Sequence, residues 1–308
     1  MEYTKTELRF KELHLELLEL ETKILSWKNT LYKVRSSRNR PRTDDKILTS
    51  WNALMQKAYI DAYRVFGNSS YLEKAIKNAS FIKENQINAD GSMFHNFKNG
   101  KSTIAGFSED YAHTIAAFIE LYQATFNEEW LNSAKQLADY SIQHFLNKES
   151  SMFYFTSDKE ENLIARKTEV YDDVIPSSNS VLAESLFKLG HYYSNKEYSD
   201  LAKQMLSNMN EDIEESPSSY SNWLVLYLNY SNPFYEVGIS GDNAQDKLKE
   251  LDQSYLPNVL ISGAKAKSEL PLLQNKYIEG ETYVYVCVNG TCKMPVTSTE
   301  KALSQILK

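Results

Sequence analysis

The sequence predicts a mainly α-helical protein built as an α/α toroid, with a small α/β appendage at its C-terminal end. Three segments repeat the same pattern of an apolar helix, a short polar turn and a second helix, which is typical of stacked or toroidal helical folds. The connections alternate between short turns inside each pair and long loops between pairs. After about residue 232 the helical pattern gives way to short runs rich in β-branched and aromatic residues.

A long helix is expected before the repeats. Its apolar residues recur at alternating spacings of four and three, which places them along one stripe of the helix. They are Leu13, Leu17, Leu20, Ile24, Trp27, Leu31 and Val34. We expect this stripe to pack against a larger helical assembly.

The repeated helical pairs are the basis of the fold prediction. They occupy residues 51–82, 110–142 and 178–209, and residues 219–230 are similar to the opening helix of a fourth pair. Long loops at 86–108 and 147–176 lead into the first helices of the second and third pairs. If these first helices run parallel, their N-termini and the long loops gather on one face, where functional sites are usually built.

We therefore expect two domains, a helical-hairpin toroid region at 1–231 and an appendage at 232–308. The appendage is predicted as a βαβ-like unit around a helix at 243–254, followed by a hairpin and a final helix from about residue 298. The hairpin turn is predicted at Asn289-Gly290, because Asn-Gly is favoured in two-residue turns.

Acidic residues occur three times at the same place, around the start of the first helix of each pair. They are Asp44 and Asp45, Glu109 and Asp110, and Asp172 and Asp173. A toroid would bring these positions together around one pocket. The candidate substrate-binding residues beside them are Arg40, Arg42, Asp44, Lys46, Trp51, Asn52, Tyr111, Asp172, Ser177 and Asn179.

Two interpretations of these acids stay open. Asp, Ser and Asn are favoured at helix N-caps, where the helix dipole also stabilises a carboxylate. One cap needs one acceptor, however, so capping does not explain the doublets. Carboxyl groups beside aromatic and amide side chains are what carbohydrate chemistry uses, with one carboxyl as acid and another as base.

Asp45, Glu109, Asp110 and Asp173 are the predicted catalytic residues. The helix dipole lowers the pKa of a carboxyl at a helix start, which favours Asp110 or Asp45 as the base, whereas burial would be needed for an acid, for which Glu109 is better suited. His95 lies in a loop that could reach the same face, and His113 follows Asp110 by one helical turn. For both histidines a structural role is the expectation.

Five motifs resemble, in this order, those of the YyaL and spermatogenesis-associated thioredoxin-domain-containing proteins. They are RPRTDDKILTSWN, GFSEDYA, IPSSNS, YEVGISG and YVCVNGTCKMP. The resemblance runs from about Leu31 to the C-terminus, and it implies a region similar to six-hairpin glycosidases and sugar 2-epimerases that follows a thioredoxin-like domain. It also implies that the chain corresponds to the C-terminal part of such a protein, with an incomplete toroid.

The predicted function is that of a carbohydrate-active enzyme, glycosidase-like or sugar isomerase/epimerase-like, with a sugar-like ligand in an acid- and aromatic-lined pocket. The histidine and arginine set of related epimerases has no counterpart that can be assigned in this sequence. The alternative is a non-catalytic region that binds a ligand or a protein and is accessory to the thioredoxin-like domain, which is the expected partner. A third possibility is a helical solenoid with a long concave protein-binding surface.

The remaining predictions concern partners, location and cysteines. The net charge of −7 argues against nucleic acid as a partner, and no apolar run is long enough for a membrane span, so the cytoplasm is expected. Cys287 and Cys292 would lie opposite each other across the Asn-Gly hairpin, about 4.5 Å apart at their Cα atoms, which permits a disulfide. Reduced thiols are the expectation in a cytosolic protein. We predict neither a metal site nor a cofactor.

Overall fold

The computed structural model describes residues 17–160 and 165–307. The chain divides into two compact units, Met1–Asp45 and Lys46–Lys308. The described part of the first unit contains one helix, α2 (Leu17–Ser36), with basic residues in its last turn. Trp27, Leu31 and Val34 of its predicted stripe are exposed, whereas Leu20 is buried within the described part. Leu13 and the side chain of Leu17 lie outside the described residues.

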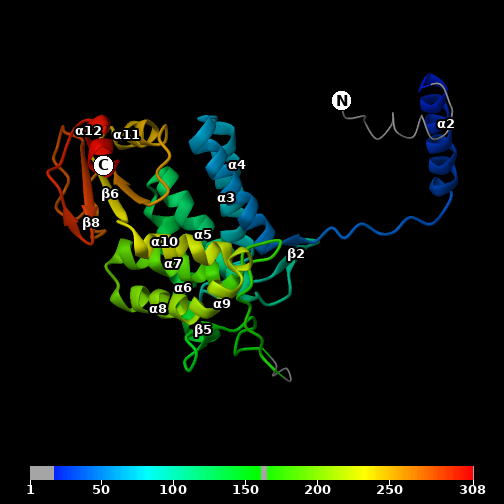
Figure 1. Cartoon of the computed structure of the whole chain (residues 1–308), viewed down its shortest axis with the longest axis horizontal. Coiled ribbons are helices and arrows are strands. Elements are labelled where there is room, and N and C mark those ends of the chain that lie inside the picture. The colour runs from blue at the N-terminus through cyan, green and yellow to red at the C-terminus, as the bar shows by residue number, and fades with distance from the viewer. Residues whose placement is uncertain (1–16, 161–164, 308) are drawn as a thin grey trace. The chain divides into compact units, whose positions relative to one another are not determined.

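The second unit begins with three helical hairpins, as the sequence predicted (Figure 1). Their helices are α3 (Thr49–Phe66) with α4 (Ser69–Asn85), α5 (Ser108–Thr125) with α6 (Glu128–Phe145), and α7 (Ser178–Tyr193) with α8 (Lys196–Asn208). They are followed by α9 (Asn210–Glu215), a 3-10 turn η1 (Pro217–Tyr220) and α10 (Ser221–Ser231). The predicted mainly α-helical architecture of repeated helical hairpins is confirmed.

Each hairpin turns in the same way. The first helix ends at a residue in the left-handed conformation, Gly67, Phe126 or Ser194. The next residue is in each case an asparagine whose side-chain oxygen accepts a hydrogen bond from a backbone N–H at the start of the second helix. A left-handed residue satisfies the last carbonyls of one helix and an asparagine cap satisfies the first amides of the next, so the turn can be this short.

Burial separates the helices into two layers. α5 and α7 are buried along most of their lengths, as expected for inner helices. α4, α6 and α8 bury a narrower stripe, which includes Ala75, Ala134 and Ala202 at equivalent places in the repeat. The inner helices pack in the order α3, α5, α7. They run parallel, because side-chain contacts join the starts of neighbouring inner helices and Glu120 joins the later turns of all three.

The long loops contain short strands. In the loop before α5, β2 (Asn96–Lys98) pairs with β3 (Lys101–Ser102), and β2 also pairs with β1 (Ile47–Leu48) directly before α3, so that the three strands form one antiparallel sheet. The loop before α7 pairs β4 (Leu146–Asn147) with β5 (Met152–Phe153). These pairings fix the loops at the N-terminal ends of the inner helices.

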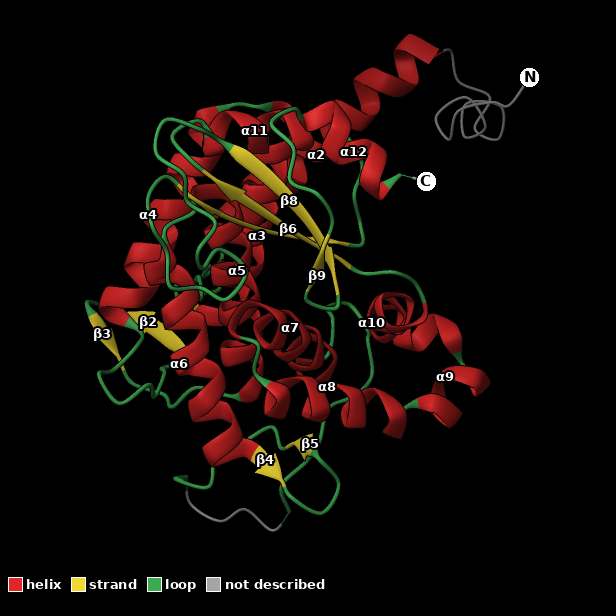
Figure 2. Ribbon diagram, turned by 90° about the vertical axis from the view of Figure 1, so that its left-hand side faces the viewer, coloured by secondary structure: helices red, strands yellow, loops and turns green. Residues whose placement is uncertain are grey.

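The C-terminal region forms a four-stranded sheet in the order β7-β6-β8-β9. Its elements are β6 (Tyr235–Ser240), α11 (Ala244–Leu251), β7 (Val259–Ala264), β8 (Tyr283–Val288), β9 (Thr291–Cys292) and α12 (Thr299–Ile306). β6 and β7 are parallel and β8 is antiparallel to β6, which matches the predicted βαβ-like unit. α11 and α12 share one cluster of buried apolar residues with the sheet (Figure 2).

The predicted hairpin is present, but the thiols are not free. Asn289 and Gly290 both have positive φ, as the predicted two-residue turn requires, and Cys287 pairs with Cys292 in the expected register. The two cysteines form a disulfide. The expectation of reduced thiols was therefore wrong, because it rested on an assumed reducing compartment, whereas the predicted register already permitted the bond.

The sheet is held by the C-terminal ends of two inner helices. The Tyr192 hydroxyl donates to the Ile261 carbonyl, and the Ile261 N–H donates to the Gln123 side chain. The Tyr122 hydroxyl also pairs with the Ser262 hydroxyl at 2.7 Å. Residues 46–308 thus form one compact unit, and the division into domains at residues 231 and 232 stays a prediction.

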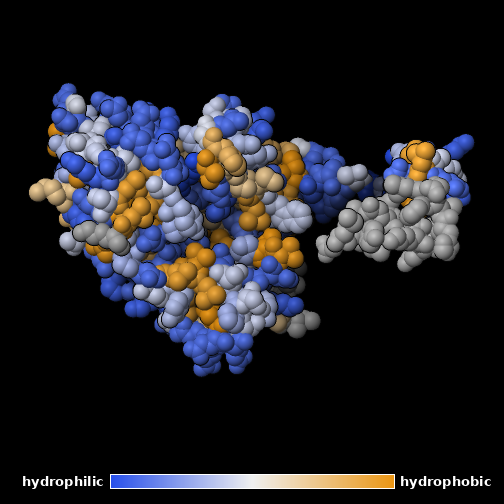
Figure 3. All heavy atoms as spheres, turned by 45° about the horizontal axis from the view of Figure 1, so that its top comes forward, coloured by the Kyte–Doolittle hydropathy of each residue, from blue (hydrophilic) through white to orange (hydrophobic). Residues whose placement is uncertain are grey.

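Several large apolar side chains remain at the surface. Figure 3 shows them as separate orange patches between hydrophilic regions. On α3, Trp51 and Met55 lie one turn apart and are exposed at 64% and 55%. Among the described residues, no helix is long and apolar enough to cross a membrane.

A buried carboxylate links the three inner helices. Glu120 of α5 lies 2.8 Å from the ammonium group of Lys188 of α7, and its other oxygen is 3.8 Å from the guanidinium of Arg64 of α3. Burial opposes the charge on Glu120, but Lys188, Lys57 and Arg64 outweigh it and lower the pKa of Glu120 to about 2. The ionised carboxylate is thus part of the helix packing.

Replacing Glu120 with Gln should destabilise the protein by about 3–5 kcal/mol, because Lys188 would keep a buried charge without its main partner. The pKa of Glu120 is lower in the folded protein than in the unfolded chain. The ionised Glu120 therefore stabilises the fold above about pH 4.5, and this contribution is lost as the pH falls towards 2. Urea unfolding as a function of pH measures both effects. The exposed pair Lys83–Glu129 supplies the control, since Glu129→Gln should cost less than about 0.5 kcal/mol. Equal costs for the two variants would contradict the prediction.

Candidate functional site

The starts of the three inner helices lie together. The backbone N–H of Ser50, in the first turn of α3, donates to Oδ1 of Asp110 in α5 at 3.0 Å. The hydroxyl of Ser108, at the start of α5, donates to that of Ser178, at the start of α7, at 2.9 Å. Two of the three acidic positions singled out in the sequence, the one at the start of α5 and the one before α7, are therefore neighbours.

Asp110 is fully buried and its carboxylate is occupied by protein groups. Besides Ser50, it accepts the backbone N–H of Phe107 at 2.9 Å, and its Oδ2 lies 2.9 Å from Nδ1 of His95. As the third residue of α5, Asp110 closes the N-terminal turn of its own helix. It thus joins α3, α5 and the loop that carries His95.

His95 is fixed by its backbone as well as by its ring. Its N–H donates to the Ile104 carbonyl at 2.8 Å, and its carbonyl accepts from the N–H of Thr49 at 2.9 Å. The ring packs against Phe107, with 4.9 Å between ring centroids. The hydrogen bond to Asp110 raises the pKa of His95 in spite of partial burial. A positioned imidazole of this kind can transfer protons near neutral pH.

Glu109 connects this histidine–aspartate pair to a cavity of about 510 Å³. One Glu109 oxygen lies 4.0 Å from Nδ1 of His95, and its side chain is 20% exposed. Burial, and next the charge of Asp110, raise the pKa of Glu109. The cavity is lined by Glu109, Thr168, Glu169, Val170, Tyr171, Asp173, Val174, Ile175, Pro176, Ser177 and Ser178.

Glu169 is a second carboxyl group of the cavity that sequence reasoning missed. Burial raises its pKa, and its charge adds to the raised pKa of Glu109. Asp173 lines the same cavity and is exposed. The only signal for Glu169 was its place in the long loop before the third pair, which does not distinguish it from other loop acids.

Three predicted residues with buried side chains hold the cavity wall in place, and of these only Ser177 lines the cavity itself. Asp172 accepts hydrogen bonds from the Ser177 N–H and from the Asn222 N–H at the start of α10. Ser177 caps α7. The Asn179 amide group bonds both backbone groups of Phe153 and the carbonyl of Glu169. These contacts hold the loop from Thr168 to Ser178 against α7.

Tyr111 is also buried. Its hydroxyl accepts the N–H of Met93 at 2.7 Å and its ring stacks on Tyr140. The Asn52 side chain donates to the backbone carbonyl of Leu48, and the backbone carbonyl of Asn52 accepts from the Asn78 side chain. Neither residue is among those that line the 510 Å³ cavity, and neither is Trp51, which is exposed on α3.

The other predicted residues lie before α3. Lys46 opposes the raised pKa of His95 through its positive charge. Arg40, Arg42, Asp44 and Asp45 belong to the separate N-terminal unit. Their contribution to the site stays a prediction.

Three groups have the spacing of a possible metal site. One ligand atom each from His95, Glu109 and Asp110 lies within 4.8 Å of the others. In the arrangement described, Nδ1 of His95 is directed at Asp110, and Asp110 already accepts two backbone hydrogen bonds. A cation would have to displace the proton shared by this pair, so the geometry favours a hydrogen-bonded pair.

Comparison with known proteins identifies the relatives. The model of glycosyl hydrolase family 76 matches residues 49–165. Human spermatogenesis-associated protein 20 is 27% identical over 305 residues, covering 92% of this chain and 39% of the relative. The unsaturated glucuronyl hydrolase of Formosa agariphila is 24% identical and covers 62% of this chain and 50% of its own length. The chain spans about two fifths of the curated spermatogenesis-associated relatives.

A solved structure shows the same fold. The GH76 alpha-mannanase of Bacteroides thetaiotaomicron aligns with a TM-score of 0.50 and 15% identity, covering 75% of this chain and 66% of the mannanase. The resemblance to the six-hairpin glycosidase-like region of the spermatogenesis-associated thioredoxin-domain-containing proteins, inferred from the five motifs, is confirmed.

Replacing Asp110 with Asn should return the pKa of His95 towards its ordinary value of about 6.5, because the hydrogen bond that raises it is lost. NMR titration of the histidine ring protons measures this shift. Asp158→Asn, which changes the partner of His144 instead, should leave the midpoint of His95 unchanged.

The same pair predicts a pH-dependent stability. Since the native pKa of His95 is raised, its contribution is present below about pH 6.5 and is lost as the pH rises through the native pKa. The difference in unfolding free energy between the wild type and Asp110→Asn should therefore be larger near about pH 6 than near about pH 9. A difference that grows with pH would contradict this assignment.

Proposed function

We propose that this chain, a homologue of spermatogenesis-associated protein 20, is a carbohydrate-active enzyme that acts on a sugar bound in the cavity beside Glu109. The observation that supports it most is the combination found at the start of α5. Glu109 borders the cavity, and the buried Asp110 beside it holds His95. Carboxyl groups with raised pKa values at a cavity are a common arrangement for acid–base catalysis.

Glu109 acts as the general acid. Its raised pKa keeps a proton on the carboxyl group at a higher pH than an exposed glutamate would, so it can protonate a glycosidic oxygen. Asp173, exposed at the same cavity, acts as the base that activates water or takes a proton from the substrate. Breaking a glycosidic bond in this way needs one carboxyl of each kind.

Asp110 is a positioning residue in this proposal. Its side chain is fully buried, so it acts on the substrate only through His95 and through the charge it places beside Glu109. Nδ1 of His95 is 4.0 Å from a Glu109 oxygen, too far for a direct hydrogen bond, so His95 acts on Glu109 through its charge, which opposes the raised pKa of Glu109. Asp45, Arg40, Arg42, Asp44, Lys46, Trp51 and Asn52 are not among the residues that line this cavity, and their predicted roles stay predictions.

The relatives indicate which sugars to test. One relative is named as an unsaturated glucuronyl hydrolase, and the protein of similar fold is an alpha-mannanase. A substrate panel should therefore contain aryl α-mannosides, α-mannan oligosaccharides and unsaturated glucuronides. Free mannose and cellobiose test isomerase and epimerase activity.

Glu109→Gln should lower kcat/KM by about 10²–10⁴-fold on the best substrate of the panel, because the amide cannot donate the proton. In the wild type, kcat/KM should fall as the pH rises through the raised pKa of Glu109, since the acid form is then lost. Glu149→Gln, an exposed acid in the turn between β4 and β5, is the control and should keep wild-type activity.

The same substrate screen distinguishes the proposed enzyme from the alternative, a non-catalytic binding region. Saturable binding of a sugar by the wild type without turnover of any member would contradict the enzymatic proposal and favour a binding region. Turnover that survives in Glu109→Gln would contradict the assignment of the general acid.

A further inference from the structure

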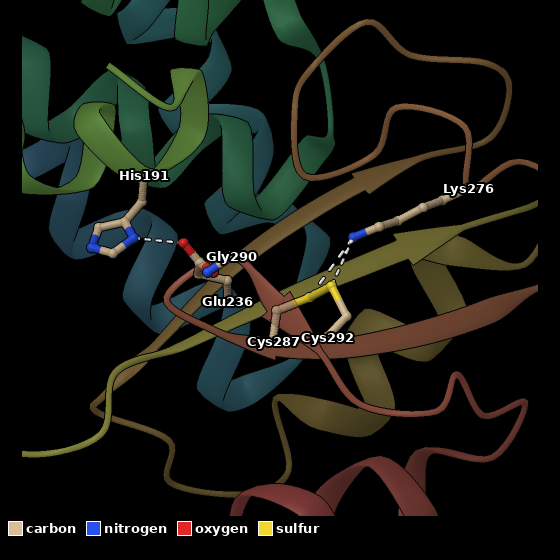
Figure 4. Close-up of a disulfide and its surroundings, with 6 residues drawn as sticks. All are labelled: His191, Glu236, Lys276, Cys287, Gly290 and Cys292. Carbon is tan, nitrogen blue, oxygen red and sulfur yellow. Dashed lines mark hydrogen bonds and ion pairs between the residues drawn. A yellow bond between two sulfur atoms is a disulfide. The ribbon is translucent and has the colours of Figure 1, made fainter. Parts of the chain in front are cut away.

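The hairpin at the end of the sheet carries a disulfide whose two sulfur atoms differ in access to solvent. Cys287 lies in β8 and is 1% exposed, whereas Cys292 lies in the edge strand β9 and is exposed. Figure 4 shows the bond beside the Asn-Gly turn, with Lys276 directed at it from one side. An external thiol can therefore approach the sulfur of Cys292 but not that of Cys287.

The ammonium group of Lys276 lies next to both sulfur atoms. Its Nζ is 3.4 Å from Sγ of Cys292 and 3.8 Å from Sγ of Cys287. Within the part of the chain that the structure describes, these two sulfurs are its hydrogen-bond acceptors. The Lys276 backbone carbonyl accepts from the Tyr285 hydroxyl at 3.0 Å, and Nζ lies 4.9 Å from the Tyr285 ring. A cation held this close favours a thiolate over a thiol.

The turn is anchored independently of the disulfide. The N–H of Gly290 donates to Oε2 of Glu236 at 3.0 Å, and Oε1 of Glu236 lies 2.6 Å from Nδ1 of His191 in α7. Glu236 is also the residue opposite Cys287 in the sheet. Because these contacts do not involve sulfur, the hairpin keeps its place on α7 when the disulfide opens, and the two cysteines stay close enough to close it again.

We propose that Cys287–Cys292 is a redox-active thiol–disulfide site, in which Cys292 exchanges with an external dithiol and Lys276 stabilises the thiolates. This site is separate from the cavity at Glu109, and it extends beyond the proposed sugar chemistry. Its ligand class is a reduced dithiol that presents its reactive sulfur at the exposed edge of β9.

The exchange proceeds in two steps. A thiolate of the dithiol attacks Sγ of Cys292, which forms a mixed disulfide and releases Cys287 as a thiolate beside Lys276. The second thiol of the dithiol, as a thiolate, then attacks the dithiol sulfur that is bound to Cys292 in the mixed disulfide. This closes the dithiol into a disulfide and releases Cys292 as a thiolate, whose sulfur lies 3.4 Å from Nζ of Lys276 in the arrangement described. Two electrons pass from the dithiol to the protein disulfide, and the two protons of the dithiol end on the protein cysteines or in solvent.

The first experiment follows alkylation of the reduced protein. The wild type is reduced with dithiothreitol, freed of reductant and pulsed with iodoacetamide across a range of pH, and each cysteine is quantified by mass spectrometry. Cys292 should react at least about tenfold faster than Cys287 near neutral pH, as expected for an exposed, cation-stabilised thiolate. Equal rates for the two cysteines would overturn the assignment of the exchanging sulfur.

The second experiment tests Lys276 with a matched variant. Lys276→Met should lower the rate of Cys292 alkylation near neutral pH by about 3- to 10-fold and move its pH midpoint upwards, since one pKa unit is a tenfold change in thiolate. Lys267→Met, on an exposed loop, is the control and should match the wild type. An unchanged pH midpoint in Lys276→Met would overturn the role of Lys276.

The third experiment uses the wild type alone, so that it does not depend on the folding of a variant. The oxidised protein is equilibrated with mixtures of reduced and oxidised dithiothreitol, and its thiols are counted after each step. Reversible opening and closing, with circular dichroism unchanged, supports the proposal. A disulfide that resists excess reductant in the folded protein, or that opens only as the protein unfolds, contradicts it.

Discussion

The parallel packing of α3, α5 and α7 depends on one buried charge, the carboxylate of Glu120. A lone buried carboxylate would cost several kcal/mol in desolvation. Here Lys188, Lys57 and Arg64 surround it, and they come from the two helices on either side of α5. Arg64 continues to Asp252 at the end of α11, so the same network reaches the sheet layer. The three helices are thus tied below their N-terminal ends, and their starts have to open on the same face.

At that face, the two acids of each doublet differ in burial, both in the doublet at the start of α5 and in the doublet before α7. Asp110 and Asp172 are buried, and each joins two elements by accepting backbone N–H groups. Their neighbours Glu109 and Asp173 line the cavity. Capping or bridging of helix starts therefore accounts for one acid of each doublet. For the other acid, which lines the cavity, a catalytic role stays a proposal.

How far the sequence could predict the structure depended on the range of each interaction. The hairpins follow from local periodicity, and the register of Cys287 and Cys292 follows from the two-residue turn between them. The disulfide itself depends on redox conditions, which no local pattern encodes. Asn179 was expected to face the substrate, but its amide group bonds the backbone of Phe153. Such contacts between a side chain and a distant backbone depend on the path of the long loop, which residue spacing in the sequence does not predict.

The pairing of His95 with Asp110 shows the same limit at the site. His95 comes from a loop that two backbone hydrogen bonds place against α3 and Ile104. A lone loop histidine is more often structural, and nothing in its neighbouring residues indicates a carboxylate partner fifteen residues away. Lys188 and Glu120 were missed for a related reason, although a signal existed. Charged residues in the middle of otherwise apolar inner helices are costly to bury alone, so they indicate a buried network.

The two ends of the inner helices differ in what they contact. Near the C-terminal ends of α5 and α7, Tyr122, Gln123 and Tyr192 bond β7. At their N-terminal ends the helix dipole favours ionised carboxylates, which alone would make Glu109 a poor acid. The wall from Thr168 to Ser178 reverses this, because it buries Glu109 and brings Glu169 near it, and both raise the pKa of Glu109. The acid proposed for catalysis therefore depends on the loop that Asn179 and Asp172 hold in place.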